Sequence, residues 1–240
     1  MPSWAVTHFS VSTWQQPVPL PASPGRTALP DDLAAQVDRL SNARTRVAID
    51  GRTAAGKTSF DHELAGALDR LGRPVLRATL DDFKRPWRDR HRYDRESAEG
   101  YYRNAFDLDR VNRLLLDPAA PDGTGSCVLC SIDPNTQVDH ADVVTTMPDD
   151  AIMIVDGVFA FRPELNDAWD LRIWLEVDPG LSLRRGIERD GPDTEHLHRE
   201  RYRGSEELYL AESDPLARAD VVIDNTDLAN PNARWRRTGP

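Results

Sequence analysis

Short apolar runs recur along the chain, and most of them are bounded by glycine, proline or aspartate. Runs of this length and composition are typical of strands buried inside a sheet. Two of the runs, Cys127–Ile132 and Val138–Thr145, flank a turn at residues 133–136 and predict a small β-hairpin. The others predict the five strands of one main sheet: Arg46–Asp50, Val75–Leu80, Ala151–Val155, Leu171–Val177 and Asp220–Ile223.

Segments with apolar residues at helical spacing separate these strands. Leu33, Val37 and Leu40 predict a short helix from Asp31, and a second helix is expected from Lys57 to about residue 71. Further helices are expected before residue 116 and over residues 181–189 and 195–210. Because strands alternate with helices, we predict an α/β fold with a doubly wound, mainly parallel sheet.

The two ends of the chain lack this periodicity. Residues 1–30 are rich in proline, so we expect a flexible leader there. Residues 229–240 are polar and rich in arginine and asparagine, and we expect a flexible tail. The region between them, residues 31–228, has no internal repeat and is predicted to form a single domain.

Composition and charge exclude several functions. Of the 240 residues, 39% are hydrophobic and 29% are charged, which is the balance of a globular protein rather than a disordered or fibrous one. The net charge of −10 opposes binding to nucleic acids and to anionic membranes. No apolar run approaches the roughly 18 residues of a membrane span. The first basic residue is Arg26, so a secretory signal is not expected and we predict a cytoplasmic protein.

A glycine-rich segment carries the first chemical signal. Gly51-Arg-Thr-Ala-Ala-Gly-Lys-Thr58 matches the pattern Gly-x-x-x-x-Gly-Lys-Ser/Thr between a predicted strand and a predicted helix. In such a loop the glycines let backbone amides surround phosphate oxygens, the lysine reaches the β- and γ-phosphates, and the hydroxyl binds magnesium. ATP and Mg²⁺ are therefore the expected cofactors. The candidate nucleotide-binding residues are Gly51, Arg52, Thr53, Ala54, Ala55, Gly56, Lys57, Thr58 and Ser59.

Carboxylates close two of the predicted strands. Ligands of open α/β sheets bind beyond the carboxyl ends of the strands, so these residues are functional candidates. Asp156 is a candidate magnesium ligand together with Thr58. Asp81 is the candidate base that takes the proton of an acceptor hydroxyl. Only Lys57 and Lys84 are lysines among the 30 basic residues, so a lysine is expected to mark a special site.

With these residues in view, the chain resembles the uridine kinase and phosphoribulokinase family of P-loop kinases, most closely its divergent bacterial members labelled uridine kinase-like. The likeness covers roughly residues 44–227. Besides the phosphate loop it rests on Asp81–Phe83, Tyr101–Asp109, Val155–Phe159, Arg184–Asp190 and Ala219–Asn225.

This resemblance implies a P-loop NTPase fold with a helical lid. It implies Asp81 as catalytic base and magnesium contact, and Asp156 as the acidic residue of the third strand. The arginines implied to stabilise the transferring phosphate are Arg184, Arg185 and Arg189. Asn225, after the last strand, is expected either to line the adenine pocket or to form a turn.

The resemblance also implies where the acceptor binds. Ile132 stands where a uracil-contacting Tyr is usual, Gln137 where a His is usual, and Asn104 where a ribose-binding Asp is usual. The chemical identity of the acceptor therefore stays open. The basic segment Lys84–Arg95 is either a solvated loop or a source of arginines for a phosphate on the acceptor. The candidate acceptor residues are Asp82, Phe83, Tyr102, Asn104, Ile132 and Gln137.

We therefore expect a kinase that uses ATP and Mg²⁺ to phosphorylate a hydroxyl of a uridine-like nucleoside or a similar small molecule. Its expected catalytic residues are Lys57, Asp81, Arg185 and Arg189. The alternative acceptors are a nucleoside monophosphate, a pantothenate-like alcohol and a sugar phosphate, because fold does not decide among them. The alternative from another class is a non-catalytic ATP-binding switch. The expected partner is a small-molecule acceptor, and the sequence leaves open whether copies of the chain form a homo-oligomer.

Overall fold

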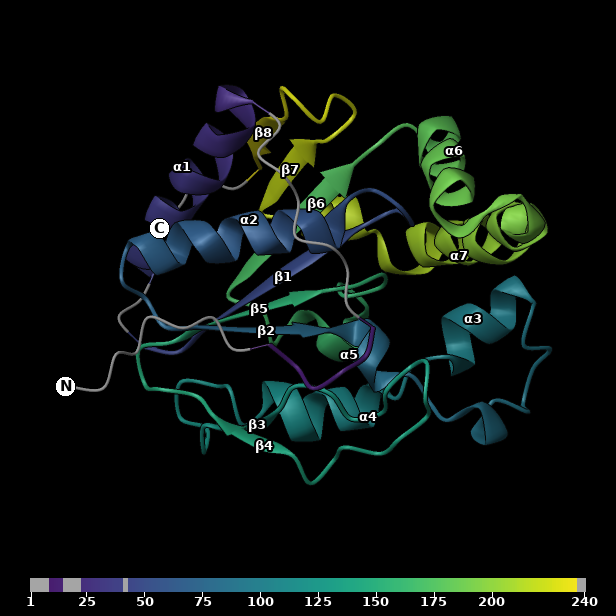
Figure 1. The fold of residues 1–240 in the computed structure, drawn as a ribbon, viewed down its shortest axis with the longest axis horizontal. Coiled ribbons are helices and arrows are strands. Elements are labelled where there is room, and N and C mark those ends of the chain that lie inside the picture. The colour runs from purple at the N-terminus through teal and green to yellow at the C-terminus, as the bar shows by residue number, and fades with distance from the viewer. Residues whose placement is uncertain (1–8, 15–22, 41–42, 237–240) are drawn as a thin grey trace.

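The computed structural model describes residues 9–14, 23–40 and 43–236 and has the predicted α/β architecture (Figure 1). Its centre is a six-stranded sheet with the order β2-β5-β1-β6-β7-β8, and a separate two-stranded sheet pairs β3 with β4. All neighbours in the main sheet are parallel except β8, which is antiparallel to β7. The strands are Thr45–Gly51 (β1), Val75–Thr79 (β2), Ser126–Val128 (β3), Val144–Thr146 (β4), Ile152–Asp156 (β5), Leu171–Glu176 (β6), Val221–Asp224 (β7) and Asn232–Trp235 (β8).

Helices cover both faces of the main sheet. The α-helices are Pro24–Leu40 (α1), Lys57–Arg70 (α2), Ala98–Asn104 (α3), Leu108–Arg110 (α4), Pro163–Asn166 (α5), Pro179–Asp190 (α6), Arg203–Ser213 (α7) and Pro215–Arg218 (α8). Short 3-10 turns lie at Leu80–Phe83 (η1), Trp87–Asp89 (η2) and Pro192–Thr194 (η4), and π-helical turns at Val111–Leu116 (η3) and Leu197–Tyr202 (η5).

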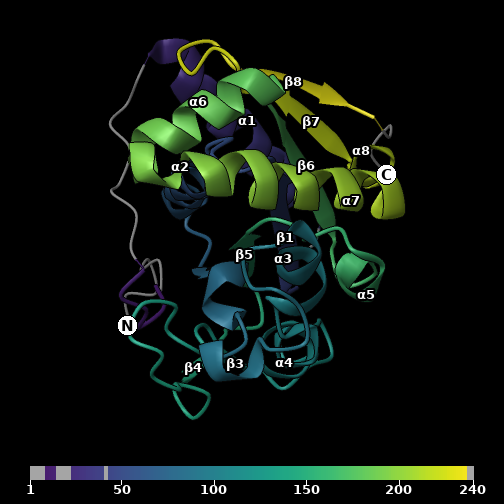
Figure 2. The same ribbon diagram turned by 90° about the vertical axis from the view of Figure 1, so that its right-hand side faces the viewer.

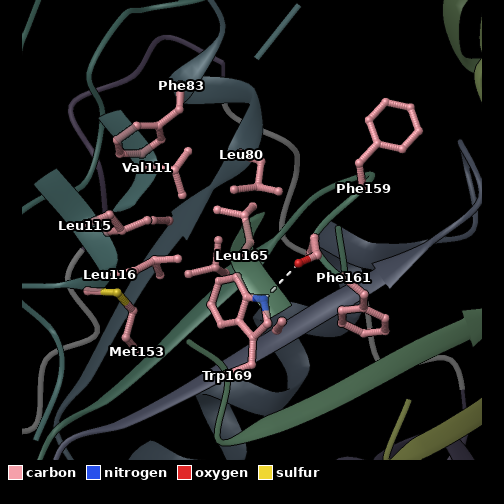
Figure 3. Packing of buried hydrophobic residues seen from close by; sticks show 14 of the residues in the cluster. Leu80, Phe83, Val111, Leu115, Leu116, Met153, Phe159, Phe161, Leu165 and Trp169 are labelled. Carbon is pink, nitrogen blue, oxygen red and sulfur yellow. Dashed lines mark hydrogen bonds between the residues drawn. The ribbon is translucent and has the colours of Figure 1, made fainter. Parts of the chain in front are cut away.

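Two apolar clusters flank the sheet because successive strand residues point to opposite faces. Val47 and Ile49 belong to the cluster with α1 and α2. Ala48 belongs to the other cluster, which includes residues of α3, η3 and α7. Figure 3 shows part of the second cluster, in which Leu115 and Leu116 lie beside the strand residue Met153. The same view shows Trp169 Nε1 donating to the Ala160 carbonyl oxygen at 2.8 Å.

The structure differs from the predicted leader. The first helix begins at Pro24 rather than at Asp31, and residues 9–14 contact the domain through hydrogen bonds such as Thr13 N to Asp133 Oδ2, at 2.6 Å. The helix extends because Arg26, within its first turn, is buried and bonded to Glu63 of α2. The predicted flexibility of residues 1–8 and 15–22 lies outside the described residues.

The predicted tail also differs. Residues 232–235 form β8 along the edge of β7, so the predicted five-stranded sheet has a sixth strand. Backbone groups of an open edge strand pair whatever the polarity of the added side chains, which is why composition did not reveal this strand. Residues 237–240 lie outside the described part of the chain.

The predicted hairpin is confirmed in outline. Strands β3 and β4 pair in an antiparallel ladder, and Ile132 bridges to Asp139 nearer the turn. Within the described residues, no helix is long and apolar enough to cross a membrane.

Candidate active site

The phosphate loop joins the end of β1 to the start of α2, as predicted. Gly51 and Gly56 have φ values of 151° and 95°, which residues with side chains rarely adopt. A Cβ on Gly51 would lie 2.5 Å from the carbonyl oxygen of Leu175, and one on Gly56 would lie 2.8 Å from Asn225 Nδ2. Both positions therefore need glycine, and the loop can curl at the N-terminus of α2, where backbone amides bind anions.

Lys57 folds back across this loop. Its Nζ donates to the carbonyl oxygens of Gly51, at 3.1 Å, and Arg52, at 2.9 Å. Burial lowers the pKa of Lys57, against the nearby charges of Asp50 and Asp156. The loop thus holds the ammonium group against its own backbone, and the expected contact of Lys57 with the β- and γ-phosphates stays a prediction.

Thr58 and Asp156 form an oxygen-rich pair beside the loop. The Thr58 hydroxyl donates to Asp156 Oδ2 at 2.7 Å, and burial at the end of β5 raises the pKa of Asp156. Across the described ranges, no group of three or more His, Cys, Asp or Glu side chains could hold a metal ion. Magnesium in nucleotide sites usually takes one or two protein oxygens and completes its shell with phosphates and water. The Thr58 and Asp156 oxygens fit that kind of site.

Asp81 lies in η1, directly after β2, and forms an ion pair with Lys84. The distance from Lys84 Nζ to Asp81 Oδ1 is 2.6 Å. Burial raises the pKa of Asp81, but the ion pair with Lys84 and the charges of Lys57 and Arg189 together outweigh burial, so the net pKa is lowered. The Lys84 ammonium also lies over the rings of Tyr101 and Phe106, 5.7 and 5.6 Å from their centroids. Asp81 is therefore held ionised, as a base must be before it accepts a proton.

The arginines of α6 reach different parts of the site. Arg185 donates to the carbonyl oxygens of Asn225, at 3.1 Å, and Thr226, at 2.8 Å, in the loop after β7. Arg189 makes two hydrogen bonds to the Asp190 carboxylate, at 2.6 and 2.8 Å. Arg185 and Arg189 both line the cleft described next, whereas Arg184 is exposed and does not line it.

One cleft of about 620 Å³ brings these groups together. Figure 2 faces this end of the molecule, with α6 and α7 above and α3 below. The phosphate loop, η1, the end of β5 and the segment α6–η4–η5, which we call the lid, all contribute to its walls. The residues with functional groups on the cleft include Lys57, Thr58, Asp81, Lys84, Tyr101, Asp156, Arg185, Arg189 and Tyr202.

Solved structures share the fold of this chain. A possible uridine kinase from Bacillus stearothermophilus matches with a TM-score of 0.63 and 22% identity, over 82% of this chain and 96% of that one. A candidate fructose transport system kinase from Silicibacter sp. TM1040 matches with a TM-score of 0.61 and 19% identity, over 78% of this chain and 95% of that one. The chain has the P-loop kinase fold. No known family model matches the sequence, and no curated protein matches it significantly.

Helix α7 adds two residues to this candidate site that the sequence did not reveal. The carboxylate of Glu206 accepts a hydrogen bond from Thr53 N, at 2.6 Å, and from Arg52 Nη1, at 3.2 Å. Tyr209 donates its hydroxyl to Asp50 Oδ2 at 2.5 Å, and burial raises the pKa of Asp50 to about 6. No motif marks Glu206 or Tyr209, because their partners lie more than 150 positions away along the chain.

Asn225 is a structural support of the phosphate loop. Its Nδ2 donates to the Ala55 carbonyl oxygen at 2.6 Å, and its Oδ1 accepts from Arg26 Nη1 at 2.5 Å. Asn225 is fully buried and is not among the residues that line the cleft. Its expected contact with adenine therefore stays a prediction, whereas its contact with the loop is a finding. Arg26, which lies within the predicted leader, is the partner of Asn225, and the sequence did not reveal this contact.

The six predicted acceptor residues do not line the cleft. Phe83 and Tyr102 are core residues, 0% and 2% exposed, because their rings pack in the cluster on this face of the sheet. Asn104 is 6% exposed, and its Nδ2 has no hydrogen-bond partner among the described residues. These side chains do not line the cleft that Asp81 lines, and their expected role at the acceptor stays a prediction.

The other three predicted acceptor residues lie nearby but outside the cleft. Asp82 is fully buried and accepts a hydrogen bond from Ser10 Oγ at 2.8 Å. Ile132 and Gln137 line a separate pocket of about 270 Å³, whose wall includes Trp87. The hairpin packs against η1 through backbone bonds from Ser131 N and Ile132 N to the Asp82 carbonyl oxygen, at 3.0 and 2.9 Å.

The basic segment after Asp81 is partly ordered by contacts within the protein. Arg85 lies 3.5 Å from the Asp107 carboxylate, and Arg90 donates to the Arg85 carbonyl oxygen at 2.6 Å. Arg95 lies over the Trp87 ring, 5.7 Å from its centroid. Lys84 is the residue of this segment that lines the cleft.

Proposed function

We propose that the protein is a phosphotransferase that uses ATP and Mg²⁺ to phosphorylate a hydroxyl of a nucleoside or a similar small molecule. The observation that carries this proposal is the single cleft onto which the phosphate loop, Asp81 and the lid arginines all open. A carboxylate opposite the phosphate loop is what an acceptor hydroxyl requires, because that hydroxyl must lose its proton as it attacks phosphorus.

Each group has a role in this reaction. The loop amides and Lys57 bind the phosphates of ATP, and Thr58 and Asp156 would hold the metal. Bound Mg²⁺ supplies positive charge to the β- and γ-phosphate oxygens. Asp81 takes the proton of the acceptor hydroxyl while the new oxygen–phosphorus bond forms and the bond from the γ-phosphorus to the bridging oxygen breaks, releasing ADP.

The two lid arginines have separate roles in this proposal. Arg185 bonds to the loop after β7, so we assign it to the nucleotide side of the cleft. Burial and Lys84 act most strongly on the pKa of Asp81, and Arg189 is close enough to lower it as well. We therefore assign Arg189 to the transferring phosphate, where positive charge stabilises the transition state.

The identity of the acceptor is the more specific part of the proposal. The names of the two solved neighbours include uridine and fructose, so these two compounds head the set to be tested. Nucleoside monophosphates, sugar phosphates and pantothenate complete it, because Lys84 on the cleft could bind an anionic group.

ADP release by the purified protein, with ATP and Mg²⁺ and each acceptor in turn, tests this function. Lys57→Ala is the blank, because loss of the ammonium group removes charge stabilisation of the transferring phosphate. We expect at least one acceptor to raise ADP release well above the rate without acceptor. If ATP binds but no acceptor changes the rate, the proposal fails and an ATP-binding switch becomes the better explanation.

A further inference from the structure

Residues 9–14 precede the first helix and pack against η1 and the hairpin. Thr13 is fixed to the hairpin by two bonds to Asp133, from its N at 2.6 Å and from its Oγ1 at 3.0 Å. Ser10 Oγ donates to Asp82 Oδ2 at 2.8 Å. Figure 2 shows this short purple segment beside the hairpin region.

An aromatic contact fixes the start of the same segment. The Phe9 ring lies 5.8 Å from the His62 ring, and the Arg77 guanidinium lies 5.1 Å from the Phe9 ring centroid. Residues 9–14 are therefore tied to α2, to β2, to η1 and to the hairpin. A segment with so many attachments presents its last side chain, Trp14, in a defined place.

Trp14 is half-buried and lies on two cavities. It lines the main cleft, whose walls include Asp81 and Lys84. It also lines a cavity of about 40 Å³ that is bounded by Thr58 and Asp156 among others. The indole therefore shares a small cavity with the candidate metal ligands and a wall of the larger cleft with the candidate base.

Of the residues that the family resemblance assigned to the acceptor, Asp82 lines the small cavity beside Trp14, and none lines the main cleft. Phe83 and Tyr102 are core residues, and Ile132 and Gln137 line a different pocket. Trp14 lies outside residues 44–227, which the resemblance covers, so no motif could have identified it. The aromatic side chains that line the main cleft among the described residues are Trp14, Tyr101 and Tyr202.

We propose that Trp14 is a specificity-determining residue that stacks on a flat unsaturated ring of the acceptor while the acceptor hydroxyl lies at Asp81. The proposal rests on the function proposed above and narrows its substrate class to acceptors with such a ring. Indole presents a large apolar face, and stacking on a nucleobase-like ring is favourable whatever the ring's hydrogen-bonding groups. The anchors at Thr13 and Ser10 reduce the entropy lost when the acceptor binds.

The test compares Trp14→Ala and Trp14→Phe with wild type, using uridine, fructose and pantothenate as acceptors. Trp235→Ala is the matched control, because Trp235 is 38% exposed on β8 and does not line the cleft. We expect Trp14→Ala to raise the KM for uridine roughly tenfold, with the KM for ATP unchanged. Trp14→Phe should restore most of the affinity, and Trp235→Ala should match wild type. Melting temperatures of all variants exclude a general loss of structure.

Two results would overturn the proposal while leaving the kinase function intact. One is an equal KM for uridine in Trp14→Ala and wild type. The other is turnover of fructose or pantothenate but not of uridine by the wild type. If the wild type binds ATP but phosphorylates no acceptor, the proposed function fails first, and the inference about Trp14 fails with it.

Discussion

At the scale of single residues, two side-chain pairs, each with one carboxylate, organise the site. Thr58 donates to Asp156, and Lys84 forms an ion pair with Asp81. The second pair matters for chemistry because Lys84, together with Lys57 and Arg189, lowers the pKa of the candidate base despite its burial. A carboxylate in that state can accept a proton when the acceptor arrives.

Replacing Asp81 tests this role. Asp81→Asn keeps the shape of the side chain but removes the group that takes the proton, so we expect kcat to fall roughly 10²- to 10⁴-fold. The measurement is steady-state ADP release with a responding acceptor. Asp89→Asn is the matched control, because Asp89 is an exposed aspartate of η2 that does not line the cleft. Near-normal turnover by Asp81→Asn would rule out its assignment as the base.

Sequence predicts these residues only where a motif fixes them. Lys57, Thr58 and Asp156 follow from the phosphate loop and from a strand end, and the structure brings them together. Lys84 stands out in the sequence as one of two lysines, but no sequence pattern predicts its contact with Asp81. Phe83 and Tyr102 were assigned to the acceptor by resemblance, whereas packing of their rings places them in the core.

At the scale of elements, α7 connects the lid to the phosphate loop. Glu206 and Tyr209 lie three residues apart and therefore on one face of the helix. Glu206 holds the loop at Thr53, and Tyr209 holds Asp50 at the end of β1. Ser182 of α6 adds a bond to the Thr53 carbonyl oxygen at 2.6 Å. The loop is thus fixed from the lid side as well as by its own strand and helix.

Removing the Glu206 carboxylate should loosen the loop. Glu206→Ala leaves Thr53 N and the Arg52 guanidinium without their acceptor, so we expect ATP to bind roughly tenfold more weakly. Calorimetric titration with a non-hydrolysable ATP analogue and Mg²⁺ measures this. Glu207→Ala is the control, because the next residue on α7 has a side chain that is 64% exposed. Equal affinities for the two variants would show that Glu206 does not support the loop.

Elements were predicted well where a local pattern specifies them. The five parallel strands and the helix after the phosphate loop appear close to their expected positions, whereas the two hairpin strands pair only over Ser126–Val128 and Val144–Thr146. The strand β8 did not follow from pattern, because its side chains are polar and its stability comes from pairing with β7. The early start of α1 depends on buried Arg26, whose partners are Glu63 and Asn225.

At the scale of the whole molecule, distant segments meet around His62. This residue of α2 lies against Arg77 of β2, with its Nδ1 2.7 Å from Arg77 Nη1, and beside the Phe9 ring. Burial and the neighbouring guanidinium lower the pKa of His62 to about 4. The unfolded chain, with an ordinary histidine pKa of about 6.5, therefore binds the proton more readily than the folded protein between these values.

His62 should make stability depend on pH. Since the unfolded state takes up the proton, this group lowers the free energy of unfolding by roughly 2 kcal/mol as pH falls from 7 toward 4.5. His62→Gln should lose that part of the pH dependence, which urea denaturation at the two pH values measures. The exposed His91→Gln is the control. If the free energy of unfolding changed between pH 7 and pH 4.5 by the same amount in His62→Gln as in wild type, this account would be contradicted.

The central claim is that the cleft transfers phosphate from ATP to a small-molecule hydroxyl. The most direct measurement follows the radiolabelled γ-phosphate of ATP and separates the products by chromatography, with uridine and the other acceptors present in turn. The account predicts a labelled, phosphorylated acceptor from the wild type and none from Lys57→Ala. Label that appears only as inorganic phosphate, or that stays in ATP with every acceptor, would contradict it.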